Sequence, residues 1–524
     1  MSHIDPPIQT PLPDSAIGTK IIRNTASGVL RLVVLAPIPF LLTPFLLRHI
    51  GASGFGIWAV LLSFNGLTAL ADFGVMGTLT KHVSEHYTHG DYLSLNRVIN
   101  AGVLMFSIIA LAGLLTMQAA TGFLISVFFR QSALPLIQIQ HAIRLLGVAI
   151  ALNLLAFPFA SVIAGLQRLD LTNLLWGLNA LITAIAAVVF IELGRGIDGL
   201  VDAIVLTSAI IFLLNVILTR KLLPQLRIHP GHVRMADVKA LSVFSLKVYV
   251  VQMASMVYFH TEKLLLAHFA GPTPVGWYEI ANDLALKLRN APALLMTPLL
   301  PAAAELEVRG DDARTSEMYY RAHKYLAFVG VAMIAVVGLL AHRFVALWLG
   351  PGFSPAARAL IVLTAVQIAN LAAGPALFIL IGRGTLGPAV RFALVGMFGT
   401  LILSSILISL RGFTGALYGT SISVLSAAAY LIWMFHQETG FSIRRLLKIY
   451  VLPLAWGLCI IGLTSRLVPV GQFHWVGVIL TAISVGAAYS AGLLLLRYFD
   501  AFDLRVLQRF VPIPEALFTS RLFR

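Results

Sequence analysis

Long apolar windows, each able to form a membrane-spanning helix, dominate this chain of 524 residues. A helix needs about 20 apolar residues to cross the roughly 30 Å hydrocarbon core of a bilayer. The chain is 59% hydrophobic and only 11% charged, far below the charge content of a soluble domain. We therefore predict an all-α polytopic membrane protein with about 14 transmembrane helices (12–14). The predicted spans are residues 27–48, 55–78, 98–128, 141–165, 169–191, 197–219, 240–269, 276–303, 322–348, 356–381, 387–410, 413–435, 446–465 and 473–496.

The Lys and Arg residues that give the net charge of +15 are unequally divided between the two predicted sides of the membrane. With the N-terminus inside and alternating spans, 23 of the 37 Lys and Arg fall on inside loops and tails, and seven fall outside. The positive-inside rule then predicts that both termini are cytoplasmic. This distribution explains the high charge without a nucleic acid partner.

Two short sequences recur at nearly one spacing. The turn GASGFGIW at 51–58 is echoed by GPTPVGWY at 271–278, and the turn GLQR at 165–168 is echoed by GRG at 382–384. The echoes predict two six-helix bundles related by a pseudo-two-fold axis along the membrane normal, with an appended helix pair. Chance similarity among Gly-rich turns is the alternative. The predicted parts are a flexible N-terminal tail (1–26), two bundles (27–236 and 237–440), the appended pair (441–496) and a basic amphipathic tail (497–524).

The single cysteine, Cys459, lies among apolar residues of the thirteenth predicted span. It has no partner for an internal disulfide, so we interpret it as core filler.

The stretch 258–305 is unusual because two apolar spans carry several charges. A charge in hydrocarbon costs roughly 2.5–3.5 kcal/mol on insertion scales, so such residues face a partner or a wet cavity. An anionic group that enters such a place would need cations there. The candidate cavity cations are Lys287, Lys263, Arg31 and Arg289.

Helix geometry refines these candidates. Asp283 and Lys287 are four residues apart and can pair, whereas Lys287 and Arg289 point about 200° apart. We prefer Lys287 as the cavity residue and leave Arg289 as cavity-lining or interhelical. Structural ion pairs that lock the seventh span to the eighth are the alternative reading.

The carboxylates raise the question of energy coupling. Glu262 and Asp283 lie in predicted spans, and a carboxylate in a dry cleft can exchange a proton near neutral pH. Asp72 is a third candidate, although a helix-end interaction is the better account of it. Proton and sodium antiport both stay open, and we expect no bound cofactor or metal.

Three runs resemble one family: LLRHIGASGFGIWAVLLSFNGLTALADFGVMGTLTKHVSE, GLQRLDLTNLL and TEKLLLAHFAGPTPVGWYEIANDL. They are similar to the oligosaccharide flippase branch of the multidrug/oligosaccharidyl-lipid/polysaccharide exporter superfamily, over about residues 20–440. The resemblance implies two bundles around a central cavity that opens alternately to each side. It also implies a cargo of undecaprenyl-diphosphate-linked oligosaccharide. Where many relatives have Asp, this chain has Glu262, which keeps the charge.

Three function classes follow. The leading one is a flippase that carries lipid-linked oligosaccharide from the cytoplasmic to the periplasmic leaflet, with polysaccharide polymerase or assembly proteins as further partners. The alternatives within the superfamily are a flippase for lipid-linked peptidoglycan precursor and a drug or ion antiporter. A membrane polysaccharide polymerase or ligase fits less well, because the longest loops lie on the basic inside. We therefore expect a transporter and not an enzyme.

Overall fold

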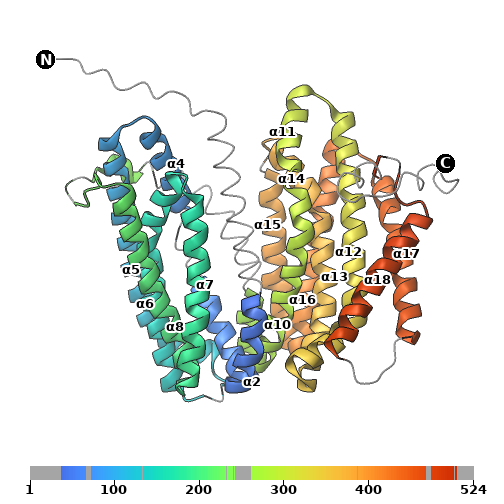
Figure 1. Ribbon diagram of the computed structural model, residues 1–524, viewed down its shortest axis with the longest axis horizontal. Coiled ribbons are helices and arrows are strands. Elements are labelled where there is room, and N and C mark those ends of the chain that lie inside the picture. Colours follow the sequence, from blue (N-terminus) through green and yellow to red (C-terminus); the bar gives the residue numbers. More distant parts are fainter. Residues whose placement is uncertain are drawn as a thin grey trace. The chain divides into compact units, whose positions relative to one another are not determined.

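The computed structural model describes residues 37–66, 72, 74–132, 134–229, 231, 233–239, 241, 261–385, 387–467, 474–500 and 502–503. All regular elements in these ranges are helical. The chain divides into two compact units, Met1–Met253 and Ala254–Arg524 (Figure 1).

Besides a short helical stretch at residues 235–239, the described part of the first unit contains six helices. They are α2 (Pro37–Gly66), α4 (Val75–Thr88), α5 (Tyr92–Phe128), α6 (Leu136–Gly165), α7 (Leu169–Glu192) and α8 (Gly196–Leu222). Within α2 the backbone breaks at Gly51, which has φ 68° and ψ 176°. Apolar side chains of α4, α5 and α6 form a common core that includes Leu79, Ile99 and Val162.

The second unit begins its described part with helical residues 261–270. The helices that follow are α10 (Pro272–Ala293), α11 (Leu299–Arg309), α12 (Asp312–Leu349), α13 (Ser354–Ala372), α14 (Gly374–Gly382), α15 (Gly387–Gly399), α16 (Ser405–Thr439), α17 (Ile443–Leu467) and α18 (Trp475–Leu495). A 3-10 turn η2 (Leu294–Met296) separates α10 from α11, and a π-helical turn η4 (Thr400–Ser404) joins α15 to α16.

Eleven helical stretches of the described residues are long and apolar enough to cross a membrane. The predicted all-α polytopic fold is confirmed, and the chain is a multi-pass membrane protein. Some helices merge two predicted spans: α16 turns at Gly412, with φ 55° and ψ −129°, between the windows 387–410 and 413–435. The predicted span 276–303 is broken, because η2 interrupts it.

Glycines with positive φ recur at matching places in the two units. Gly51 and Gly271 have φ of 68° and 82°, and Gly90 and Gly310 have φ of 69° and 64°. Both pairs are 220 residues apart. An Asp follows each glycine of the second pair and caps the next helix, since Asp91 accepts from the N–H of Ser94 and Asp311 from that of Arg314, both at 3.0 Å.

The second sequence echo has a shared packing geometry. A Cβ added at Gly165, at the end of α6, would lie 2.6 Å from Val83 Cγ1 of α4. A Cβ added at Gly382, at the end of α14, would lie 2.7 Å from the carbonyl oxygen of Leu300 in α11. Only glycine lets the helices approach this closely. These matches support a repeat, while the bundle boundaries at 236/237 and 440/441 stay predictions.

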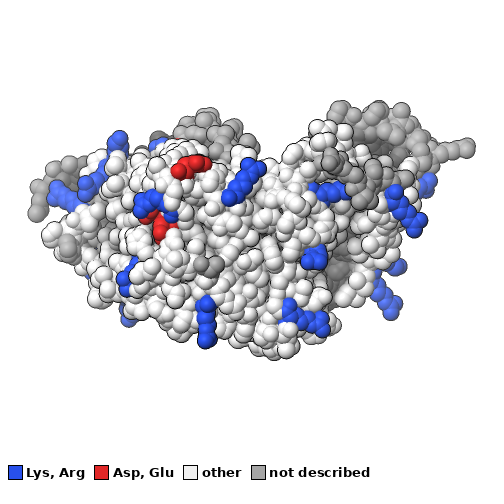
Figure 2. All heavy atoms as spheres, turned by 90° about the horizontal axis from the view of Figure 1, so that it is seen from below, with Lys and Arg blue, Asp and Glu red and all other residues white. Residues whose placement is uncertain are grey.

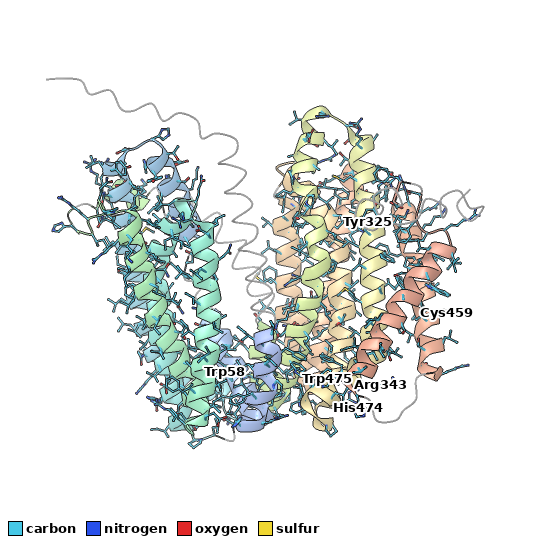
Figure 3. All side chains as sticks on the ribbon, in the orientation of Figure 1. Trp58, Tyr325, Arg343, Cys459, His474 and Trp475 are labelled. Atoms are coloured by element: carbon cyan, nitrogen blue, oxygen red, sulfur yellow. The ribbon has the colours of Figure 1, made fainter. Side chains whose placement is uncertain are left out.

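The appended helices α17 and α18 pack on α12. The contact uses apolar residues of all three helices, among them Val331, Ile460 and Tyr489. The prediction for Cys459 is wrong: this residue is exposed on α17 (Figure 3). Only one face of α17 packs on protein, so an apolar sequence context does not place a residue in the core.

Aromatic and charged residues mark two levels along α12. Trp475 packs edge-on against Phe344, with ring centroids 5.8 Å apart, and Figure 3 shows it beside His474 and Arg343 at one end of the second unit. Tyr325 lies nearer the opposite end of the unit. Eighteen residues of helix rise about 27 Å, which is close to the thickness of the hydrocarbon core.

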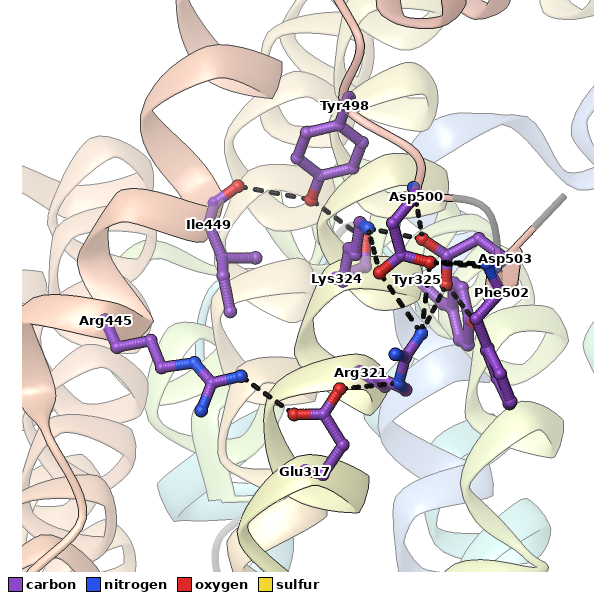
Figure 4. Close-up of polar contacts among 10 residues, drawn as sticks. All are labelled: Glu317, Arg321, Lys324, Tyr325, Arg445, Ile449, Tyr498, Asp500, Phe502 and Asp503. Carbon is purple, nitrogen blue, oxygen red and sulfur yellow. Dashed lines mark hydrogen bonds and ion pairs between the residues drawn. The ribbon is translucent and has the colours of Figure 1, made fainter. Parts of the chain in front are cut away.

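An ionic cluster fastens the segment after α18 to α12 (Figure 4). The carboxylate of Asp503 is buried, accepts from Arg321 Nη1 at 3.0 Å and Tyr325 OH at 2.7 Å, and also binds Lys324. Asp500 pairs with Arg321 at 3.3 Å. Residues 504–524 of the predicted basic tail lie outside the described residues.

Glu317 extends this cluster to α17. Its two carboxylate oxygens accept from Arg321 Nε at 2.7 Å and from Arg445 Nη2 at 2.8 Å (Figure 4). Burial raises the pKa of Asp500, but the N–H of Asp503 and the cations of Lys324 and Arg321 outweigh it and lower this pKa to about 2. A carboxyl with a depressed folded pKa stabilises above its ordinary value of 3.8, and this contribution is lost as the pH falls through about 2.

Basic side chains elsewhere are dispersed. On the face in Figure 2, Lys and Arg stand singly over a largely uncharged surface, and acidic residues are few. The described part of that face therefore carries its positive charge without a continuous basic patch.

We predict that Asp503→Asn lowers the thermal stability of the purified protein. Removing one partner of a buried ion pair costs about 3–5 kcal/mol, because the remaining charges stay buried. The measurement is thermal unfolding in detergent. Glu305→Gln is the control, since its pair with Arg309 is more than half exposed on both sides and is worth under about 1 kcal/mol. Equal small shifts in the two variants would contradict the assigned role of the cluster.

Candidate functional site

The charged stretch predicted from the sequence forms two helical segments in the second unit. Residues 261–270 and α10 meet at Gly271, whose φ of 82° turns the chain sharply. Adjacent residues on the first segment point about 100° apart, so Glu262 and Lys263 have different partners.

Glu262 is buried among hydroxyl groups. Its Oε1 accepts from Ser404 Oγ at 2.8 Å, and its Oε2 contacts Tyr278 OH and Thr420 Oγ1. Its side-chain partners in the described structure are these three hydroxyls, from η4, α10 and α16. The carboxyl group therefore sits at the junction of four helical segments.

Close packing of η4 against α16 positions these hydroxyls. A Cβ at Gly419 would lie 2.4 Å from Ser404 Oγ, and one at Gly415 would lie 1.9 Å from the carbonyl oxygen of Leu407. Gly415 and Gly419 thus let the helical segments before and after Gly412 pack in close contact. The π-helical turn shifts the helical register locally, and Ser404 at its end reaches Glu262.

Lys263 forms a buried ion pair with Glu279 of α10. Its Nζ lies 2.6 Å from Glu279 Oε2, and the two side chains are 8% and 18% exposed. Such a pair locks the segment 261–270 to α10, as the structural alternative expected. Lys263 is therefore largely shielded from a ligand.

Lys287 and Asp283 form the ion pair that their spacing predicts. Lys287 Nζ lies 2.5 Å from Asp283 Oδ2, and the side chains are 41% and 46% exposed. Both belong to α10, a helix within a candidate membrane span. This pair is accessible, in contrast to that of Lys263.

Arg289 points in another direction. Its Nη1 donates to Gln367 Oε1 of α13 at 3.2 Å, and Gln367 is buried. The sequence left two roles open for Arg289, cavity-lining and interhelical. The contact with Gln367 is interhelical.

The remaining predicted residues lie apart from this cluster. Asp72 is in the first unit, where its Oδ1 accepts from the N–H of Met76 at 2.8 Å at the start of α4. This is the helix-end interaction that the sequence favours. Arg31 lies outside the described residues.

Sequence reasoning missed the hydroxyls of Tyr278, Ser404 and Thr420 as partners of Glu262. Ser404 and Thr420 are more than 140 residues from Glu262 along the chain. Single Ser and Thr are common in membrane spans, so the residue types themselves did not single out these positions. The nearby glycines Gly415 and Gly419 were the one available hint of close helix contact.

This chain is similar to known proteins of polysaccharide biosynthesis and transport. Residues 21–307 match the family model described as polysaccharide biosynthesis protein. The Shigella flexneri protein named "Putative O-antigen transporter" is 19% identical over 419 residues, which cover 79% of this chain and 97% of the relative.

Two solved membrane proteins share the fold. The structure titled lipid II flippase MurJ, in an inward closed conformation, has a TM-score of 0.71 at 15% identity and covers 90% of this chain and 98% of its own. An inward-facing multidrug resistance MATE family transporter of the MOP superfamily has a TM-score of 0.65 at 14% identity, covering 79% and 98%. The family model covers more than half of the chain, and the chain therefore belongs to the polysaccharide biosynthesis protein family.

Proposed function

We propose that this protein is a transporter that moves undecaprenyl-diphosphate-linked oligosaccharide from the cytoplasmic to the periplasmic leaflet by alternating access. The observation that carries the proposal is the exposed Asp283–Lys287 pair on the membrane-spanning helix α10. An accessible charge pair on a membrane-spanning helix needs a polar ligand or a water-filled path. Family membership and the name of the Shigella flexneri relative support the cargo class.

The cargo chemistry assigns different roles to the cations. A diphosphate oxygen can replace Asp283 as the partner of Lys287, because both are anionic oxygen acceptors. Exchange of one anion for another leaves Lys287 paired in the loaded and unloaded states. Lys263 already has a buried carboxylate partner, so its role is structural.

Glu262 is the proposed coupling residue. Thr420 Oγ1 contacts both Glu262 Oε2 and, at 2.9 Å, the carbonyl oxygen of Ala416. One hydroxyl donates only one proton. If Thr420 donates its proton to the carbonyl oxygen of Ala416, its contact with Glu262 needs a proton from the carboxyl group. A protonated Glu262 supplies that proton. A buried charge without a cation partner is costly, and protonation removes it.

The second candidate cargo is a lipid-linked peptidoglycan precursor. The fold shared with the protein named lipid II flippase favours it, and its diphosphate would make the same demand on Lys287. For either cargo, we place the protein in the inner membrane with both termini cytoplasmic. Enzymes of polysaccharide assembly are its proposed partners.

Lys287→Ala is expected to reduce transport about 10- to 100-fold, since a hydrogen bond to a charged group is worth about 1.5–3 kcal/mol. Lys287→Arg keeps the charge and should retain most activity. The measurement is surface polysaccharide and inner-leaflet lipid-linked oligosaccharide in a deletion host complemented by each variant. Arg309→Ala, an exposed cation of α11, is the control. Full rescue by Lys287→Ala would refute the cargo role, and accumulation of peptidoglycan precursor would select the second cargo.

The Lys263–Glu279 pair should behave differently. Lys263→Met or Glu279→Leu alone should lower stability by about 3–5 kcal/mol, whereas the double variant should return close to wild type. Thermal unfolding measures this, and the stable double variant should still transport. A stable but inactive double variant would place Lys263 in the cargo site instead.

Glu262→Gln should fold and lose the dependence of transport on an imposed proton gradient. The amide is neutral, and its NH₂ group can donate to Thr420 in place of the carboxyl proton. Transport by reconstituted protein with and without a pH gradient tests this. Asp72→Asn is the matched control, because Asn also caps helices. Undiminished proton dependence in Glu262→Gln would exclude this residue, and dependence on a sodium gradient at constant pH would identify sodium as the coupling ion.

A further inference from the structure

A pocket in the first unit lies where α5 begins. It is lined by Tyr92, Leu93, Asn96, Arg97, Gln225 and Arg227 and has a volume of about 350 Å³. At about 30 Å³ for each water, it has room for roughly ten water molecules. A phosphate group with part of its ester would fit this space.

The chain after α8 forms one wall of the pocket. Asn96 accepts from the N–H of Arg227 at 2.8 Å and donates to the carbonyl oxygen of Gln225 at 3.4 Å. One turn further along α5, Asn100 accepts from the N–H of His229 and donates to the carbonyl oxygen of Arg227, both at 2.8 Å. The N–H and the carbonyl oxygen of Arg227 are thus both hydrogen-bonded to α5. We call residues 225–229, which these bonds fix against α5, the strap.

The pocket is cationic. The guanidinium of Arg97 makes one side-chain hydrogen bond in the described structure, to Ser94 Oγ at 2.8 Å. The nearby carboxylate of Asp91 accepts from the N–H of Ser94 and caps α5. Arginine has five donors in a planar fork that matches phosphate oxygens. Arg97 of α5 and Arg227 of the strap both line the pocket, and two such groups can bind one phosphate.

The rim of the pocket is apolar and exposed. Leu93 is 70% exposed and Tyr92 is 41% exposed, as is Ile228, which follows the lining residue Arg227 in the strap. The predicted span that α5 contains begins at residue 98, so the pocket lies next to the membrane boundary. A cationic pocket beside exposed apolar and aromatic side chains suits the headgroup level of a bilayer. This rim favours a lipid over a free phosphate ion.

We propose that this pocket binds the phosphate of an anionic lipid headgroup through Arg97 and Arg227, with Tyr92 and Leu93 beside the acyl chain. The site is separate from the cargo site and independent of which cargo is carried. Because Arg227 belongs to the strap, the bound lipid holds the strap on α5. The anionic lipid content of the membrane thereby stabilises the segment that follows α8.

The test uses the full-length protein in detergent, titrated with phosphatidylglycerol or with phosphatidylcholine. Wild type should retain phosphatidylglycerol in native mass spectra and gain thermal stability, whereas phosphatidylcholine should do neither. Arg97→Gln and Arg227→Gln should each weaken retention about tenfold, the loss of one charge-assisted contact. Arg227 is exposed, and its substitution should therefore not disturb folding. The Arg227→Gln variant thus keeps the test valid if Arg97→Gln misfolds.

The matched control is the double variant Arg444→Gln/Lys448→Gln. It removes two exposed cations from the start of α17, and it should bind phosphatidylglycerol as wild type does. Equal retention by wild type and Arg227→Gln would overturn the proposal. Competition by millimolar inorganic phosphate, with equal stabilisation, would also overturn it, because the pocket would then be a free phosphate site.

Discussion

A charge within a membrane span has to be satisfied by the protein, and this constraint organises the second unit. Hydrocarbon offers no hydrogen bonds, so each buried polar group requires a partner. Glu262 finds three hydroxyls, and Lys263 finds Glu279. These contacts join the segment 261–270 to α10, η4 and α16. The packing around these two helical segments follows from the need to give each charged side chain a polar partner.

Small residues allow the helices to approach closely enough for these polar contacts to form. Lipid chains are as apolar as the helix surfaces, so helices associate in membranes by close packing and polar contacts. Gly419 lets Ser404 approach α16, and this approach brings both Ser404 and Thr420 to Glu262. At the other packed sites, Gly165 and Gly382 bring helix ends together in each unit. Glycine at these positions therefore serves contact rather than flexibility.

Much of the fold could be predicted from the sequence, because span length and loop charge are local properties. The Asp283–Lys287 pair was predictable for the same reason, as both residues lie on one helix. The hydroxyl partners of Glu262 were not, since they come from helices more than 140 residues away. Cys459 shows a second limit: a membrane helix is apolar on its lipid face and its packed face alike, so apolar surroundings do not indicate burial.

Two positions on α10, the Glu262 partner Tyr278 and the charged Lys287, bear on coupling. Tyr278 near its start contacts Glu262, and Lys287 two and a half turns later is accessible to a ligand. A proton on Glu262 changes how its carboxyl group bonds Tyr278 and Thr420, and so how α10 is held against α16. If Lys287 binds the cargo anion, as proposed, that anion acts on the same helix. Two sites that bias one rigid element can be coupled without a chain of residues between them, and under this proposal α10 is the element that the two sites share.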